Sequence, residues 1–277
     1  MTGKVAGMQP PVVLTIAGSD SGGGAGIQAD IRALNARQVF AATALTAVTA
    51  QNTTTVSSVD LLSDEIVRAQ IDAVLTDLAP RAVKTGMLGQ ASTVRLVAEY
   101  ASSGKFPFLV MDPVLVTTTG FSLMDSTGAG VIRDELLAHC DLITPNVEEA
   151  QALLGRSFSV SSVDDLEKLG VALLEFGPRA VLIKGGHAQN ALPDTSPDVL
   201  VTRTSKMVFD GARITSSNDH GTGCSLASAI AAGVALGEPL EEAVANAKSL
   251  VASAMKSSAA WRIGRGRGPL DIFGWNR

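Results

Sequence analysis

The segment at residues 219–225, with the sequence DHGTGCS, carries the residue types best suited to chemistry in this chain. Gly221 and Gly223 let the backbone turn so that several N–H groups point the same way, and an Ala-rich stretch typical of a helix follows. A helix N-terminus adds positive partial charge, so Gly221, Thr222 and Gly223 could hold a phosphoryl group during its transfer. A plain Gly-Thr-Gly turn over a buried cysteine would explain the same residues, and this segment alone favours neither interpretation.

Cys224 falls in the first turn of this predicted helix. A helix N-terminus stabilises a thiolate, so we expect the pKa of Cys224 to lie below the ordinary thiol value of about 8.5. A thiolate there could act as general base and take the proton of an attacking hydroxyl group.

A second glycine-rich stretch, GSDSGGGAG at residues 18–26, follows a short apolar run and precedes a predicted helix. No Gly-Lys-Ser/Thr follows it, which excludes a P-loop, and the Gly-x-Gly-x-x-Gly spacing of a dinucleotide fingerprint is absent. The stretch is either a backbone that passes close to a flat ligand or a tight turn from strand to helix.

The elements that must position these residues alternate along the chain. Short apolar runs that end at turn residues predict strands at 12–18, 43–51, 82–86, 108–112, 141–144 and 180–184. Helical spacing predicts helices at 26–36, 66–75, 94–101, 130–139, 146–154 and 163–176, with two more from about Thr222 and Leu240. Residues 199–203 and 207–214 predict a small antiparallel edge pair. This order predicts an α/β fold of three layers, α/β/α, with a mostly parallel central sheet.

In such sheets ligands bind beyond the carboxyl ends of the strands. Five residues fall at predicted strand ends and should converge on one crevice: Gly18, Gly86, Asp112, Thr144 and Lys184.

Composition excludes several other classes of protein. The 22 basic and 27 acidic residues give a net charge of −5 without a basic stripe, so we expect no nucleic-acid partner, and we interpret the arginines at 262, 265 and 267 as a solvated tail. The two cysteines cannot form a disulfide framework, and the most apolar stretch, 226–236, is well short of the ~20 residues that span a bilayer. We expect a cytoplasmic protein with no membrane partner, with residues 1–10 as a flexible leader and 11–277 as a single domain.

Seven sequence blocks, taken in order, resemble the hydroxymethylpyrimidine/phosphomethylpyrimidine kinases of the ribokinase superfamily. They are AGSD with GGAGIQAD (17–20 and 23–30), TAVTAQNT (46–53), KTGML (84–88), MDPV (111–114), TPNVEEA (144–150), KGGH (184–187) and HGTGC (220–224). The tail at 264–273 is also similar. One departure is the stretch 117–121, TTTGF, which lacks a histidine that relatives often carry after the glycine.

The resemblance implies a ribokinase-like fold and ATP-dependent phosphorylation of 4-amino-5-hydroxymethyl-2-methylpyrimidine, then of its monophosphate, in thiamine biosynthesis. It also implies a homodimer and assigns roles by position. Cys224, the glycine loop 221–223 and Lys184 would be catalytic; Gly18, Asp30, Gln51, Met87 and Val114 would contact the pyrimidine; Lys184, Asn146 and Thr222 would bind ATP; Asp112 and Glu149 would hold Mg²⁺, directly or through water.

Each of these residues also has a structural explanation. Asp30 and Gln51 have the groups to hydrogen-bond a pyrimidine edge, but Asp30 could equally be a solvated helix carboxylate. Met87 and Val114 could be core residues, and Lys184 could extend its ammonium group to solvent. Asn146 with Glu149 could simply cap a helix.

Two other functions stay open. A pyridoxal or pyridoxine kinase of the same superfamily would also act on a hydroxymethyl group of a flat ring, and a non-catalytic pyrimidine-binding protein could have kept the fold. A cysteine where many ribokinase relatives have an aspartate argues against a sugar kinase.

Overall fold

A computed structural model describes residues 9–115, 124, 127–187 and 194–275. Most of the predicted leader (residues 1–8) and the stretch 117–121 lie outside the described residues. The described strands form one nine-stranded sheet in the order β3-β2-β1-β4-β5-β6-β7-β8-β9. Their bounds are β1 Val12–Asp20, β2 Phe40–Gln51, β3 Val56–Leu61, β4 Ala82–Thr85, β5 Leu109–Met111, β6 Leu142–Ile143, β7 Ala180–Lys184, β8 Asp198–Thr202 and β9 Lys206–Phe209.

The central strands from β2 to β7 pair in parallel, and antiparallel strands flank them at both edges. The predicted sheet is therefore confirmed, including the antiparallel pair β8 and β9. That pair is shorter than expected, since β9 ends at Phe209 and not near Ile214. Strand β3 was not predicted because its sequence, VSSVDL, is half-exposed to exposed throughout and carries little apolar signal.

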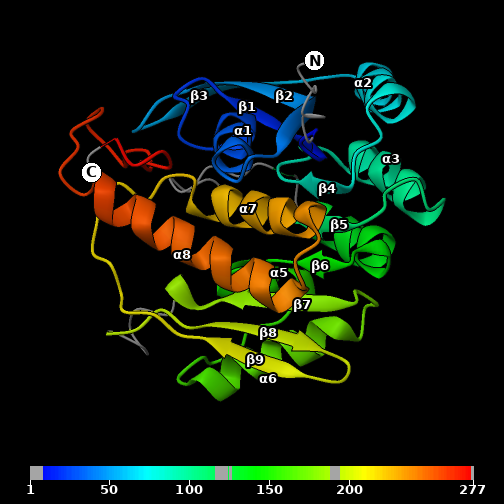
Figure 1. The fold of residues 1–277 in the computed structure, drawn as a ribbon. Coiled ribbons are helices and arrows are strands. Elements are labelled where there is room, and N and C mark those ends of the chain that lie inside the picture. The colour runs from blue at the N-terminus through cyan, green and yellow to red at the C-terminus, as the bar shows by residue number, and fades with distance from the viewer. Residues whose placement is uncertain (1–8, 116–123, 125–126, 188–193, 276–277) are drawn as a thin grey trace, which may run out of the picture.

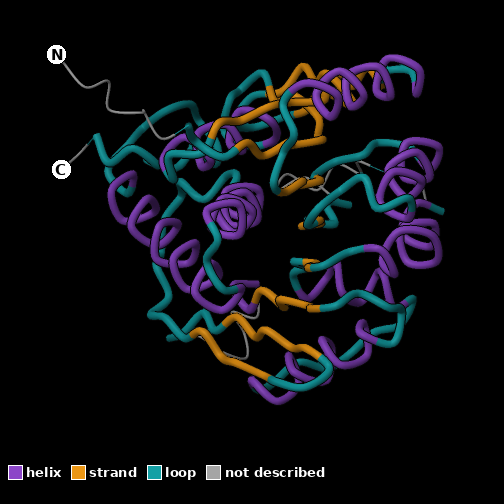
Figure 2. Tube along the Cα trace, turned by 45° about the vertical axis from the view of Figure 1, so that its right-hand side comes forward, coloured by secondary structure: helices purple, strands orange, loops and turns teal. Residues whose placement is uncertain are grey.

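Helices cover both faces of the sheet, so the three layers are confirmed (Figures 1 and 2). The helices are α1 Gly26–Ala36, α2 Asp64–Asp77, α3 Ala91–Ser102, α4 Gly128–Val131, α5 Val147–Leu154, α6 Val163–Leu174, α7 Thr222–Leu236 and α8 Leu240–Ser258. The predicted helix at 130–139 is instead α4 followed by a π-helical turn, Ile132–Leu136, and a 3-10 turn, Leu137–His139.

Each face of the sheet has its own apolar core because strand side chains alternate between faces. Leu14 and Ile16 of β1 pack toward the layer of α2, α3, α5 and α6, whereas Val13 packs toward α7 and α8. Helix α7 is buried on nearly all sides, which explains its Ala-rich sequence. Its small residues let α8 approach closely: a Cβ on Gly233 would lie 2.8 Å from Ala243 Cβ.

Candidate active site

A cavity of about 900 Å³ opens at the carboxyl ends of the parallel strands, beside the N-terminus of α7. Twelve of the thirteen predicted site residues line it: Gly18, Gln51, Met87, Asp112, Val114, Asn146, Glu149, Lys184, Gly221, Thr222, Gly223 and Cys224. The fold thus brings together residues that are more than 200 positions apart in the sequence. The exception is Asp30.

The glycine loop before α7 has the backbone shape that its sequence predicts. Gly221 has a φ of +84°, and a Cβ there would lie 2.0 Å from the carbonyl oxygen of Gly24, so no other residue fits. A Cβ on Gly223 would lie 3.2 Å from Lys184 Nζ and 3.4 Å from Asp112 Oδ2. The start of α7 therefore lies directly against a partly buried pair of opposite charges, Lys184 and Asp112.

Lys184, at the end of β7, lies between the carboxylates of Asp112 and Glu149. Its Nζ lies 2.8 Å from Asp112 Oδ1 and 3.6 Å from Glu149 Oε2. Burial would lower the pKa of Lys184, but the two carboxylates outweigh it and raise the pKa, which keeps the ammonium charged. Thr144 also donates to Asp112 Oδ1, at 3.0 Å. Lys184 is thus held at the cavity and does not extend into solvent.

Asn146 and Glu149 form a capping box at the start of α5. The Asn146 side chain accepts from the Glu149 N–H at 2.8 Å, and the Glu149 carboxylate accepts from the Asn146 N–H at 2.7 Å. The structural explanation for this pair is therefore correct, and both residues also line the cavity. The cap fixes the Glu149 carboxylate near Lys184.

Cys224 lies in the first turn of α7 and is only 9% exposed. Burial raises its pKa to about 11, although the ammonium group of Lys84 acts in the opposite direction. The expectation of a lowered pKa is therefore wrong for this structure. Desolvation, reinforced by the nearby carboxylates of Asp30 and Asp112, outweighs the effects of Lys84 and of the hydrogen bond from the Gly26 backbone, which both lower the pKa.

Apolar side chains form the opposite wall of the cavity. Met87, which follows β4, packs with Ala47 and Val114, and a Cβ on Gly18 would lie 3.0 Å from the Met87 sulfur. A side chain at position 18 would therefore crowd Met87. Met87 and Val114 are at once packed residues and part of the cavity lining.

The prediction that Asp30 contacts the pyrimidine is wrong for this structure, because its side chain is completely buried and does not line the cavity. Both of its carboxylate oxygens lie 2.9 Å from Lys84 Nζ, and it also accepts hydrogen bonds from Thr15 at 2.6 Å and Ser228 at 2.8 Å. With these partners the carboxylate supports the base of the site and has no access to a ligand. A lysine within the apolar strand β4 indicates a buried partner of opposite charge, and this is the signal in the sequence for the pair of Lys84 with Asp30.

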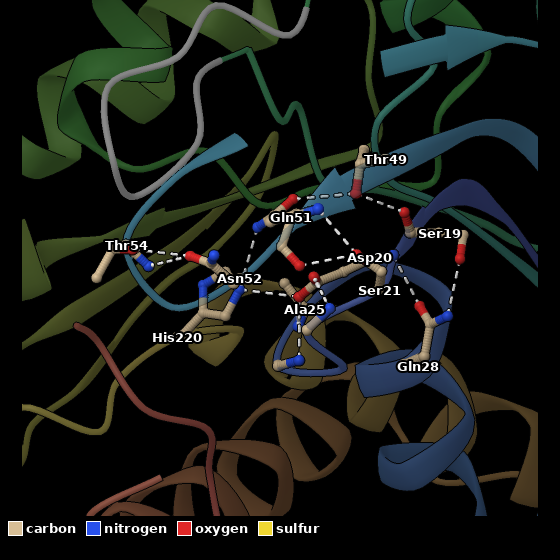
Figure 3. A network of polar contacts seen from close by, with 12 residues as sticks. Ser19, Asp20, Ser21, Ala25, Gln28, Thr49, Gln51, Asn52, Thr54 and His220 are labelled. Carbon is tan, nitrogen blue, oxygen red and sulfur yellow. Dashed lines mark hydrogen bonds and ion pairs between the residues drawn. The ribbon is translucent and has the colours of Figure 1, made fainter. Parts of the chain in front are cut away.

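Two further residues at the site were missed, Asp20 and His220 (Figure 3). The Asp20 carboxylate accepts from the backbone N–H groups of Gly22, Gly24 and Ala25, at 2.8, 3.0 and 2.8 Å, and so shapes the first glycine-rich loop. His220 Nε2 lies 2.9 Å from Asp20 Oδ2. The sequence signal was an aspartate placed directly before a run of glycines, where its side chain can cap backbone N–H groups.

Two absences apply to the part of the chain that the structure describes. No helix in those residues is both long and apolar enough to span a membrane. Nor do they contain a group of three or more His, Cys, Asp or Glu side chains that could hold a metal ion alone.

The chain is similar to known proteins over most of its length. The family model described as phosphomethylpyrimidine kinase matches residues 20–271. A hydroxymethylpyrimidine/phosphomethylpyrimidine kinase of Synechococcus elongatus is 43% identical over 266 residues, which cover 96% of this chain and 98% of the relative. A thiamine biosynthetic bifunctional enzyme of Arabidopsis thaliana, named as chloroplastic, is 45% identical over 266 residues, 95% of this chain. The chain spans about half the length of the plant relatives it matches, 47% and 50%.

Among solved structures, the pyridoxal kinase of Staphylococcus aureus in complex with AMP-PCP and pyridoxal matches with a TM-score of 0.86. It is 31% identical, and the match covers 97% of this chain and 96% of the kinase. The fold is thus the one found in small-molecule kinases, and the match of the family model over most of the chain is decisive for its affiliation. This chain belongs to the phosphomethylpyrimidine kinase family.

Proposed function

We propose that this protein transfers the γ-phosphoryl group of ATP to 4-amino-5-hydroxymethyl-2-methylpyrimidine, and then phosphorylates the monophosphate to the pyrophosphate, in thiamine biosynthesis. The observation that carries the proposal is one cavity with two kinds of wall. An apolar wall with one amide, made by Gly18, Met87, Val114 and Gln51, suits a flat heterocycle, and a glycine-lined helix start beside Lys184 suits a phosphate.

In the first transfer, the hydroxyl oxygen of the substrate bonds to the γ-phosphorus while the bond from that phosphorus to the bridging oxygen breaks, and ADP leaves. The N–H groups at the start of α7 and the Lys184 ammonium stabilise the negative charge on the moving group. The thiolate form of Cys224 takes the hydroxyl proton and becomes the neutral thiol. Asn146 and Thr222, which border the cavity, would contact ATP.

Magnesium is the metal that we propose accompanies ATP. Asp112 and Glu149 would hold it, and their carboxylates already converge on the positive charge of Lys184, so this point of the cavity stabilises a cation. Magnesium prefers one or two carboxylates plus phosphate oxygens, which fits two protein ligands without a complete protein-only site. When bound, the ion would neutralise charge on the phosphates.

The test is an ADP-release assay on purified protein with three acceptors: the hydroxymethylpyrimidine, its monophosphate, and pyridoxine. We expect turnover with both pyrimidines and a much lower kcat/KM with pyridoxine. Turnover with pyridoxine alone would replace the proposal by pyridoxal kinase activity, the second candidate, which is supported by the similarity to the Staphylococcus aureus enzyme. ATP binding without turnover on any acceptor would favour a non-catalytic binding protein.

A homodimeric assembly and a cytoplasmic location stay predictions. Light scattering coupled to size-exclusion chromatography would test the first, and fractionation of the source cell would test the second.

A further inference from the structure

Three segments that lie far apart in the sequence meet at the side chain of His220 (Figure 3). Asp20 ends β1, Gln51 ends β2, and His220 lies in the loop before α7. His220 Nε2 is 2.9 Å from Asp20 Oδ2 and 3.3 Å from Gln51 Nε2. His220 is 7% exposed, so its polar contacts are largely shielded from solvent.

If the amide nitrogen of Gln51 faces His220, the contacts among Asp20, His220 and Gln51 cannot all pair a donor with an acceptor. Burial would raise the pKa of Asp20, but hydrogen bonds from His220 and the backbone outweigh it and lower the pKa, so the carboxylate is ionised and only accepts. His220 Nε2 therefore carries the proton of the 2.9 Å bond. A protonated ring nitrogen cannot accept, and the NH₂ group of Gln51 only donates, so the contact between these two nitrogens has no acceptor.

The oxygen of the Gln51 carboxamide likewise lacks a donor in this orientation. Gln51 Oε1 lies 3.3 Å from Thr49 Oγ1, but the single proton of that hydroxyl is donated to the carbonyl oxygen of Ser19, at 2.9 Å. Exchanging the two ends of the carboxamide, which have nearly the same shape, resolves both contacts. His220 Nε2–H then donates to Gln51 Oε1 as well as to Asp20, and the Gln51 NH₂ group donates to Thr49 Oγ1. One N–H of Gln51, which lines the cavity, is left for a ligand.

His220 also packs against the first glycine-rich loop and lies next to the glycine loop at the start of α7. A Cβ on Gly24 would lie 2.2 Å from His220 Cδ2, so the ring packs directly on the first glycine-rich loop. His220 also immediately precedes Gly221, whose Cα approaches the carbonyl group of Gly24 closely enough to exclude a side chain. The two glycine-rich loops and the amide of Gln51 thus form one packed unit.

We propose that His220, held by Asp20, is a positioning residue that fixes the Gln51 carboxamide with its oxygen toward the imidazole and its NH₂ group toward Thr49 and the cavity. Gln51 then recognises the heterocycle by donating to an acceptor nitrogen of the ring. The inference rests on the proposed function and adds to it the hydrogen-bond character that the substrate ring must have.

The experiment compares kcat and KM for the hydroxymethylpyrimidine and for two analogues. One analogue replaces the ring nitrogen next to the amino-bearing carbon by C–H, and the other replaces the amino group by hydrogen. For the wild-type protein we expect the loss of the ring nitrogen to lower kcat/KM about 10- to 100-fold, the effect of leaving one buried donor unpaired. In His220→Leu, we expect KM for the pyrimidine to rise about tenfold. In the same variant, loss of the ring nitrogen should lower kcat/KM by only about threefold or less; this fall in kcat/KM is called the ring-nitrogen penalty below.

Three further variants make the result specific. His220→Gln keeps an N–H donor at a similar reach and should restore most of the penalty. Thr49→Val removes the hydroxyl that orients the NH₂ group and should weaken the penalty even if His220→Leu does not fold. His139→Leu changes an exposed histidine outside the site and should keep wild-type values.

Two results would overturn the inference. The first is a fall in kcat/KM on loss of the ring nitrogen that is as large in folded His220→Leu and Thr49→Val as in the wild-type protein. The second is a fall in kcat/KM of the wild-type protein on loss of the amino group but not on loss of the ring nitrogen. A wild-type protein that does not phosphorylate the pyrimidine at all would instead overturn the proposed function itself.

Discussion

The buried thiol of Cys224 should give the two phosphorylation steps different pH dependences. With a pKa of about 11, only about one thiol in 10⁴ is ionised at pH 7, and the ionised fraction grows about tenfold for each pH unit up to about pH 10. If this thiolate takes the hydroxyl proton, kcat/KM for the hydroxymethylpyrimidine should rise about 100-fold between pH 7 and pH 9. The monophosphate needs no base, because its phosphate has a second pKa of ~6 and is already ionised at pH 7.

The assay measures initial rates of ADP release at low acceptor concentration, at half-unit pH steps from 6.5 to 9.5, on each acceptor in turn. Cys224→Ala, measured over the same range, corrects for titration of ATP and of other residues. We expect this variant to lose most of its rate on the alcohol, to lose its pH dependence there, and to keep far more of its rate on the monophosphate.

A flat profile for the alcohol in the wild-type protein would refute the role of Cys224 as base. Equal losses on the two acceptors in Cys224→Ala would refute it as well, since the cysteine would then serve both steps through packing or charge alone.

Three other predictions concern the cavity and the buried ion pair of Lys84 with Asp30. Lys84→Met leaves the fully buried Asp30 carboxylate without its cation, so the free energy of unfolding should fall by about 3–5 kcal/mol in urea titrations, whereas the double variant with Asp30→Asn should recover a large part of that loss. Gln51→Leu should weaken pyrimidine binding by about 1–3 kcal/mol in calorimetry, and unchanged affinity would exclude a hydrogen bond between Gln51 and the pyrimidine. Asp112→Asn should raise the Mg²⁺ concentration needed for half-maximal rate, and a chelator should abolish turnover until Mg²⁺ is restored; activity that is indifferent to both would exclude the proposed metal site. The carboxylate of Asp112 also holds Lys184, so this variant should lower kcat even at saturating Mg²⁺.

Local sequence patterns determined most of the architecture. Apolar runs that stop at glycine or proline, alternating with helical spacing, fixed the parallel sheet and both helical layers, because strands and helices bury apolar side chains at different periods. The site followed from the same patterns, since the carboxyl ends of parallel strands meet at one edge, and Asp112 and Lys184 do meet there at 2.8 Å. Strand β3 was not predicted because this edge strand is half-exposed to exposed throughout and has no alternation of buried and exposed residues to detect.

The partner of each polar group, and the water that the group retains, depend instead on tertiary contacts. Asp30 has the same neighbours in sequence whether it faces a ligand or Lys84, which is 54 positions away. Cys224 lies at a helix start in either case, but the desolvation that sets its pKa comes from packing around it. The pairing of Asp20 with His220, 200 positions apart, likewise exists only once β1 and the loop before α7 are brought together. Periodicity reports which face of an element is buried, whereas partner choice and electrostatics depend on contacts between distant segments, which no local pattern contains.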